Sequence, residues 1–344
     1  MSLLRALALA FPLAIVVAFC AEWLAGGGLP GDAVTLMAAG ERLNAGHPLY
    51  ALSPGDDPVL LNPPFWTVPL LSPPFLAVVA RPFASLPDGL GAYVWWAAMI
   101  ACSVASILLL LGRMPLRTSL VIAVLSVPIA VQLMAGNIDS ALLLGMIGVW
   151  WLSQRGRQGA AGMIGGIMAV TKLTPIPIVW WFVVARRWGS VRASIAAGVL
   201  AVVVGVAGAG IDAHVAYLDV IRQTNQVGTT VGRVAGLGRT IGVPPDVARW
   251  FPVAVGFIGL ALMALFRRQP RMTWAIAVFT CVLGSPSVAF HTPALLLAAL
   301  APLAWPWGEV TGPRRAAAIV PTTTGTPSAT ARLAGSTPAG EVAV

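Results

Sequence analysis

The chain has 344 residues, of which 58% are hydrophobic and only 10% are charged, and its formal net charge is +9. Soluble domains carry about 25% charged residues, so this composition excludes an ordinary soluble protein and indicates a membrane protein. The basic residues lie in small groups between apolar segments, which is typical of membrane topology and argues against nucleic acid as a partner. The three cysteines lie in apolar segments without metal-ligand spacing and are expected to be free thiols.

Apolar segments recur along the chain, and a helix of about 20 apolar residues crosses a bilayer. We therefore predict an all-α, polytopic membrane protein with about 10 transmembrane helices. The expected spans are residues 6–24, 91–111, 118–135, 138–152, 159–171, 174–185, 191–210, 247–266, 273–285 and 288–305. With a cytoplasmic N-terminus, the arginines between the spans fall on the cytoplasmic side, and most of the acidic residues fall outside. The C-terminus is then cytoplasmic as well.

Residues 65–82 are apolar but contain four prolines. Counting them as a crossing would reverse every later loop, so we expect helices that lie in, or dip into, the outer interface. Residues 1–308 are thus predicted to form one integral membrane domain, with residues 25–90 as a structured outer loop and interfacial helices. The tail, residues 309–344, is rich in Thr, Pro, Ala and Gly and is predicted to be a disordered cytoplasmic segment.

Two half-length apolar segments, residues 159–171 and 174–185, meet at Lys172, which is the only lysine of the chain. Glycines in the first segment would allow close packing on a neighbouring helix. The meeting point predicts a cavity that reaches down from the outer face. Lys172 could hold a phosphate there, because intramembrane charges are usually functional, or it could snorkel to the interface.

Asp32 and His291 are further candidates for chemistry. Asp32 follows the glycine-rich end of the first span and could act as a general base, or it could be the N-cap of the helical segment that follows. His291 lies at the outer end of a late span and could bind a phosphate oxygen or a metal, or it could bond to the backbone at a helix end. No second ligand is spaced for a metal site on the same helix.

Asn137 and Asp139 lie between two expected spans, where they are either ordinary turn residues or polar groups at the mouth of the cavity. Asn225 lies in a long expected outer loop, residues 211–246, and could contact sugar hydroxyls. Tryptophans near the span ends are expected to form interfacial belts. They are Trp95, Trp96, Trp150, Trp151, Trp180, Trp181, Trp188, Trp305 and Trp307.

The order of several short motifs resembles that of glycosyltransferase family 87, a group of polytopic GT-C enzymes that includes actinobacterial polyprenol-phosphate-mannose-dependent mannosyltransferases. The motifs are an Asp after the first span, Ala38-Ala39, Ala45-Gly46-His47-Pro48-Leu49-Tyr50, Asn62-Pro63-Pro64-Phe65, Gln132-Leu133-Met134-Ala135-Gly136-Asn137, Ala169-Val170-Thr171-Lys172-Leu173-Thr174-Pro175, and Ser285-Pro286 with His291. The resemblance covers about residues 1–308.

The resemblance implies an inverting transferase on the outer face of the cell membrane. It would move a sugar, mannose or alternatively arabinofuranose, from a polyprenyl-phosphate donor to a glycolipid or polysaccharide acceptor. Asp32 would be the catalytic base, and Lys172 and His291 would face the donor phosphate. Asn62, Asn137 and Asn225 are expected to contact substrate. No cofactor is expected, since the ligand count permits a divalent metal but does not require one.

A lipid or sugar transporter, or a flippase, is the alternative function, since it also needs many spans and an intramembrane lysine. Such folds often contain internal repeats, and the two halves of this chain show no convincing similarity. A pure scaffold would leave Asp32 and Lys172 without a role. The absence of a P-loop argues against ATP-driven transport.

Overall fold

The structure is a computed structural model. It describes residues 30–50, 72–226, 250–285 and 291–306, together with isolated residues between 10 and 26 and residues 70, 244 and 247. The predicted tail, residues 309–344, and part of the predicted outer loop, residues 51–69, lie outside the described residues. The predicted division into a membrane domain and a tail therefore stays a prediction.

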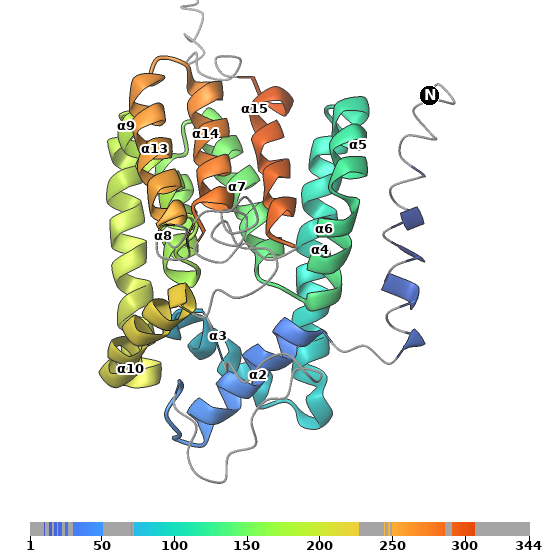
Figure 1. The fold of residues 1–344 in the computed structure, drawn as a ribbon, viewed down its shortest axis with the longest axis vertical. Helices are drawn as coiled ribbons and strands as arrows, with labels where there is room; N and C mark the ends of the chain where they lie inside the picture. Colours follow the sequence, from blue (N-terminus) through green and yellow to red (C-terminus); the bar gives the residue numbers. More distant parts are fainter. Residues whose placement is uncertain are drawn as a thin grey trace, which may run out of the picture. The chain divides into compact units, whose positions relative to one another are not determined.

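The described residues form helices joined by short turns and contain no strand, as the all-α prediction requires (Figure 1). The helices are α2 (Gly31–Asn44), α3 (Pro74–Ala84), η1 (Pro87–Gly89), α4 (Leu90–Leu111), α5 (Pro115–Val124), α6 (Ser126–Ala135), α7 (Asp139–Gln154), α8 (Gln158–Thr171), α9 (Ile176–Val184), α10 (Trp188–Gln226), α13 (Phe251–Leu265), α14 (Pro270–Leu283), η2 (Thr292–Leu300) and α15 (Ala301–Ala304).

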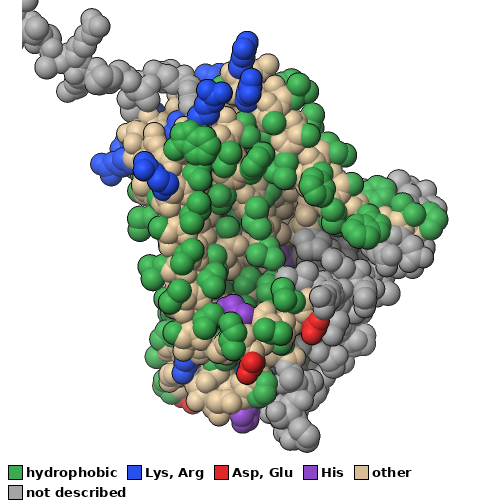
Figure 2. Space-filling model, turned by 90° about the vertical axis from the view of Figure 1, so that its left-hand side faces the viewer, with side chains coloured by type: hydrophobic (Ala, Val, Ile, Leu, Met, Phe, Trp, Pro, Cys, Tyr) green, Lys and Arg blue, Asp and Glu red, His purple; other side chains and the backbone are tan. Residues whose placement is uncertain are grey.

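The turns from α4 to α9 and from α13 to α14 alternate in chemistry. Turns at one end of the helices carry arginines: Arg113 after α4, Arg155 and Arg157 after α7, Arg186 and Arg187 after α9, and Arg267 and Arg268 after α13. Helices joined by short turns run antiparallel, so the intervening turns lie at the other end of the bundle. Most Lys and Arg side chains accordingly gather at the upper end of the face in Figure 2.

Only part of the predicted membrane topology can be recognised from helix length and hydropathy. Among the described residues, two helices are long and apolar enough to cross a membrane, Pro87–Leu111 and Trp188–Val220, and the bent pair α5–α6 would be a third. The shorter apolar helices are Pro74–Ala84, Phe251–Leu265, Pro270–Leu283 and Thr292–Ala304. These apolar helices suit a membrane protein, whereas the count of about ten spans stays a prediction.

Two expected segments differ from the structure. Residues 118–135 are not one straight helix, because α5 and α6 are bent by 74° at Leu125. Pro128 has no N–H to bond to the carbonyl four residues earlier, so a break at this point sacrifices few hydrogen bonds. Residues 211–226 were expected to start a loop, but they continue α10 after a kink at Gly210, whose φ is +83°.

The larger hydrophobic core is built around three tryptophans that are completely buried, Trp150, Trp181 and Trp274. Their ring centroids lie 4.9 to 5.6 Å apart. Each indole N–H is satisfied, by the carbonyl oxygen of Trp305, the hydroxyl of Thr273 and the carbonyl oxygen of Ala298, respectively. The expectation of an interfacial belt is therefore wrong for Trp150 and Trp181, which join α7, α9 and α14 in the protein interior.

A second hydrophobic core joins α2 and α3 to α4. Its buried residues include Leu36 and Met37 of α2, Leu76 of α3 and Trp95 of α4. Trp95 is only 5% exposed, so it too belongs to the interior rather than to a belt. Because α3 has only 11 residues, it is too short to cross a bilayer by itself. This core fixes the start of α2, which carries Asp32, against α4.

Helix α8 packs closely on α10 through glycines, as the sequence indicated. A methyl group added at Gly162 or Gly166 would overlap the carbonyl oxygens of Ser190 and Ser194 of α10. Gly159, in contrast, has open space around it. The close approach places the end of α8, and hence Lys172, at a fixed height along α10.

We predict that Gly166→Ala lowers the free energy of unfolding by about 1–3 kcal/mol, because the added methyl group must displace the α10 backbone. Gly159→Ala is the matched control on the same helix, and it should leave stability unchanged or raise it by up to about 1 kcal/mol. Thermal unfolding of both variants in detergent measures the difference. A Gly166→Ala variant that melts no lower than the Gly159→Ala variant would contradict the α8–α10 packing.

Candidate functional site

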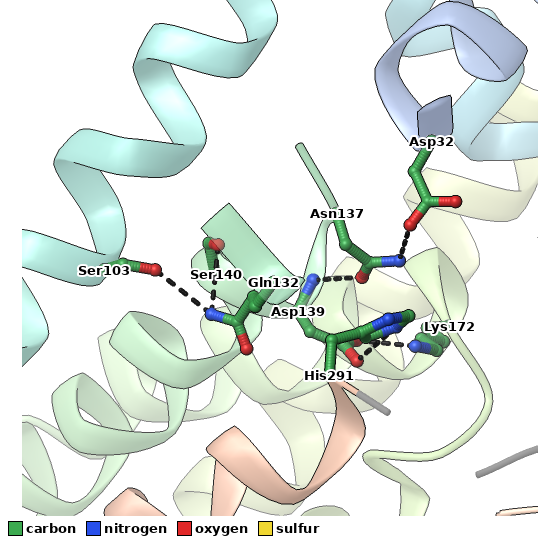
Figure 3. Close-up of polar contacts among 8 residues, drawn as sticks. All are labelled: Asp32, Ser103, Gln132, Asn137, Asp139, Ser140, Lys172 and His291. Atoms are coloured by element: carbon green, nitrogen blue, oxygen red, sulfur yellow. Dashed lines mark hydrogen bonds and ion pairs between the residues drawn. The ribbon is translucent and has the colours of Figure 1, made fainter. Parts of the chain in front are cut away.

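The turns opposite the arginine-bearing ones bring four predicted site residues together. Asn137 comes from the α6–α7 turn, Lys172 follows α8, and His291 precedes η2. Asp32 lies in the first turn of α2. Figure 3 shows these side chains around a fifth residue, Asp139, which begins α7.

Asp139 is the centre of this cluster. Its side chain has no exposed surface, and its Oδ1 atom lies 2.6 Å from Lys172 Nζ. Its Oδ2 atom lies 3.4 Å from His291 Nε2 and accepts no hydrogen bond within the described part of the chain. A buried carboxylate among apolar helices requires such partners, since an isolated buried charge is strongly destabilising. The ion pair with Lys172 therefore allows both charges to remain inside.

Asn137 connects this cluster to Asp32. The Asn137 side-chain oxygen accepts a hydrogen bond of 2.8 Å from the backbone N–H of Asp139. Its amide Nδ2 donates a hydrogen bond of 2.6 Å to Asp32 Oδ2. Asn137 is thus both a turn residue and a polar group of the candidate site. The sequence had left these two roles open as alternatives. The bond fixes one oxygen of the Asp32 carboxylate, as Figure 3 shows.

Several contacts from α4 and α6 hold the turn that carries Asn137. The indole of Trp95 donates to the carbonyl oxygen of Gly136 at 3.1 Å, and that of Trp96 donates to the carbonyl oxygen of Leu133. Gly136 has a φ of +66°, and a Cβ there would lie 3.0 Å from Ala33 of α2. Only glycine allows both this conformation and this close approach.

Gln132 adds a second restraint from the buried side of the site. Its amide nitrogen donates to the hydroxyls of Ser103 and Ser140, each at 3.0 Å. These bonds join α4, α6 and α7 directly behind Asp139 (Figure 3). Residues 132–137 therefore connect the candidate site to α4 and α7.

Asp32 does not cap α2. The helix begins at Gly31 with Pro30 at its N-cap position, and no side chain caps it. The carboxylate instead accepts the hydrogen bond from Asn137. An acidic residue in a first helical turn is also favoured by the helix dipole. The N-cap interpretation is therefore wrong, and the position leaves Asp32 available for chemistry.

Lys172 and His291 are partly buried, with side chains 21% and 12% exposed. An ammonium group has three N–H donors, and the contact with Asp139 uses one of them. Lys172 pairs with Asp139 and does not extend to the membrane interface. The ring of His291 faces the same carboxylate. Together they place an ammonium group and an imidazole ring against the buried Asp139 carboxylate.

The predicted contacts of Asn62, Asn137 and Asn225 with substrate all stay predictions. Asn62 lies outside the described residues, and Asn225 lies in α10 with no description of its side chain. Within the described part of the chain, no group of three His, Cys, Asp or Glu side chains is placed to hold a metal ion.

From the sequence, Asp139 was expected to be either an ordinary turn residue or a polar group at the mouth of the cavity. A signal was available: a lone lysine between apolar helices needs an anionic partner, and Asp139 begins a neighbouring apolar helix. Spacing could not identify the pair, because the two residues are 33 positions apart.

Comparisons with known proteins now add to this geometry. Residues 71–286 match the model of glycosyltransferase family 87. The chain is 25% identical over 253 residues to a polyprenol-phosphate-mannose-dependent alpha-(1-2)-phosphatidylinositol pentamannoside mannosyltransferase of Mycolicibacterium smegmatis, and the match covers 66% of this chain and 59% of that protein. The chain thus matches less than two thirds of that relative's length. No solved structure matches. The family model covers well over half of the chain, which therefore belongs to glycosyltransferase family 87.

Proposed function

We propose that this membrane glycosyltransferase moves mannose from a polyprenyl-phosphate donor to a glycolipid or polysaccharide acceptor, with inversion, at the outer face of the cell membrane. The observation that carries the proposal is the connected cluster of Asp32, Asn137, Asp139, Lys172 and His291. It contains a carboxylate for the acceptor, and an ammonium group and an imidazole ring for a phosphate. The donor named for the mycobacterial relative supports the choice of mannose.

Asp32 is the proposed base. As the acceptor hydroxyl attacks the anomeric carbon, its proton passes to the Asp32 carboxylate. The acceptor oxygen–carbon bond forms while the bond from the anomeric carbon to the phosphate oxygen breaks, and the polyprenyl phosphate leaves with the electron pair. This single displacement inverts the anomeric centre, so an α-linked product requires a β-linked donor. A phosphate is an adequate leaving group, so no general acid is needed.

Lys172 and His291 are the proposed partners of the donor phosphate. Fixed N–H donors stabilise the charge that grows on the departing phosphate, and such electrostatic help is usually large in sites that exclude water. Asp139 holds the ammonium group of Lys172 in place at a distance of 2.6 Å. Asn137 ties this phosphate-binding side to the base, which sets the distance over which the displacement takes place.

The charge distribution supports an active site on the outer face. The arginine-bearing turns lie at the end of the helices opposite the turns that carry Asn137 and Lys172. Basic turns stay in the cytoplasm according to the positive-inside rule. This orientation opens the cluster to the side where cell-envelope acceptors lie, with the polyprenyl chain in the lipid between helices.

The proposal predicts that membranes containing the protein transfer labelled mannose from polyprenyl-phosphate mannose to an endogenous glycolipid. The measurement is the label recovered in the glycolipid fraction, with membranes lacking the protein as the control. If label is transferred from polyprenyl-phosphate arabinofuranose and not from polyprenyl-phosphate mannose, the donor sugar is arabinofuranose. Movement of the sugar-lipid across vesicle membranes without its consumption would favour the flippase alternative and contradict the proposed reaction.

Asp32→Asn should lower the turnover rate by roughly 100- to 10,000-fold, the usual range for a lost general base. The amide keeps an oxygen that can accept the hydrogen bond from Asn137, so the melting temperature should change little. Glu41→Gln is the matched control, because Glu41 is an exposed acidic residue on the same helix, and it should transfer at the normal rate. An Asp32→Asn variant with wild-type turnover would show that another group accepts the proton.

Asp139→Asn should lower the free energy of unfolding by about 3–5 kcal/mol, because it leaves the charge of Lys172 buried without its partner. The double variant Asp139→Leu with Lys172→Met removes both charges and should recover most of that stability. It should not recover transfer, since the phosphate-binding cation is gone. Thermal unfolding and transfer assays on the same preparations separate the two effects. If the double variant recovers both stability and transfer, the pair is structural only.

A further inference from the structure

A pocket of about 430 Å³ lies at the arginine-bearing end of the helices, away from the candidate active site. It is formed by the α4–α5 turn, the end of α7 with the turn that follows, and the residues after α15. The lining residues that matter here are Arg113, Arg155, Arg157, Gln154, Trp151 and Trp305.

The three arginines bring positive charge to this pocket. Within the described part of the chain, none of them has a carboxylate in ion-pair range. The guanidinium group of Arg155 lies over the Trp151 ring, 4.1 Å from its centroid. This stacking fixes the orientation of the charged plane and leaves its edge free to donate hydrogen bonds. The pocket therefore presents many N–H donors on an aromatic wall.

Gln154 provides a second and independent observation. Its side chain is only 2% exposed, and its amide nitrogen has no hydrogen-bond partner. Buried polar groups nearly always have a partner, so an unsatisfied N–H donor that lines a pocket indicates a missing acceptor. Gln154 and the three arginines thus call for the same ligand chemistry, an anion with several oxygens.

The pocket is separate from the proposed active site. Asp139 and Gln154 are the first and last residues of α7, which places them roughly 22 Å apart at 1.5 Å per residue. The donor phosphate proposed above lies at the Asp139 end. A ligand in this pocket would lie on the cytoplasmic side in the predicted orientation.

The positive-inside rule accounts for arginines in these turns, but it does not account for the pocket. That rule explains why arginines lie near span ends. It does not explain why three of them line one pocket, or why a buried amide N–H beside them has no acceptor. Arg192, Arg267 and Arg268 are exposed arginines at the same end, and none of them lines this pocket. They provide a comparison set with equal charge.

We propose that this pocket binds a phosphate ester, either the headgroup of an anionic membrane lipid or a soluble phosphorylated molecule. The guanidinium groups and Gln154 would donate to the phosphate oxygens, and Trp151 and Trp305 would contact the organic part of the ligand. Bidentate contacts from arginine suit phosphate in particular. The proposal goes beyond the transfer reaction, and it does not depend on which sugar or acceptor the enzyme uses.

The test measures binding to the purified full-length protein in a non-ionic detergent. The probes are phosphatidylglycerol, with phosphatidylcholine as the zwitterionic comparison that has no net charge, and glycerol 3-phosphate as the soluble ester. A pocket variant combines Arg113→Gln, Arg155→Gln and Arg157→Gln, and its charge-matched control combines Arg192→Gln, Arg267→Gln and Arg268→Gln. Native mass spectrometry reports bound lipid, and calorimetry reports the soluble ester.

We expect wild type and the control variant to bind one of the two phosphate esters, and the pocket variant to lose at least tenfold in affinity. Binding of phosphatidylglycerol alone identifies a lipid headgroup, and binding of glycerol 3-phosphate identifies a soluble ligand. Equal affinity in the pocket variant and wild type, an equal loss in both variants, or no binding of either ester would overturn the proposal.

A second variant, Gln154→Met, distinguishes a ligand site from a merely structural group. Removing a buried donor that has no acceptor should raise the melting temperature of the unliganded protein. The same change should weaken ester binding. A Gln154→Met variant that melts lower and binds the ester as wild type does would contradict the role given to Gln154.

Discussion

The buried carboxylate of Asp139 is the group on which the candidate site depends. A charge without exposed surface among apolar helices persists only if other groups compensate it, and Lys172 and His291 are the groups within reach. The start of α7 and the residue after α8 must therefore stay together, because separating them would leave both charges without a partner. The carboxylate also lies 3.4 Å from His291, just before η2, so it determines where the phosphate-binding groups of the candidate site lie.

The remaining architecture protects this arrangement. The tryptophan cluster of Trp150, Trp181 and Trp274 joins α7, α9 and α14, while the glycines of α8 bring α10 into backbone contact. Trp95 and Gln132 fix the turn that carries Asn137. The polar and charged side chains thus lie at the ends of the helices, and the apolar packing contacts lie along their middles. Acid, amide and cationic side chains lie at turns on one end, arginines lie at turns on the other, and rigid apolar contacts lie between them.

The sequence predicted much of this arrangement, and its errors have physical causes. Apolar periodicity and scattered charges were enough for an all-α membrane protein, and the lone Lys172 between two half-helices marked the site. Asp139 was undervalued because its partner lies 33 positions away, and local spacing carries no information about such pairs. Trp150 and Trp181 near span ends suggested interfacial belts, but their indole N–H groups find partners inside the protein. The break at Leu125 and the kink at Gly210 could not be located from hydropathy, because apolar composition continues through both.

The central claim is that Lys172 and His291 hold the donor phosphate beside Asp32. The most direct measurement is an experimental structure of the protein with a non-transferable polyprenyl-phosphate sugar analogue bound. The account predicts phosphate oxygens within hydrogen-bond distance of Lys172 Nζ and His291 Nε2, with the anomeric carbon facing Asp32. A phosphate bound away from these two side chains, for example among Arg113, Arg155 and Arg157, would contradict it.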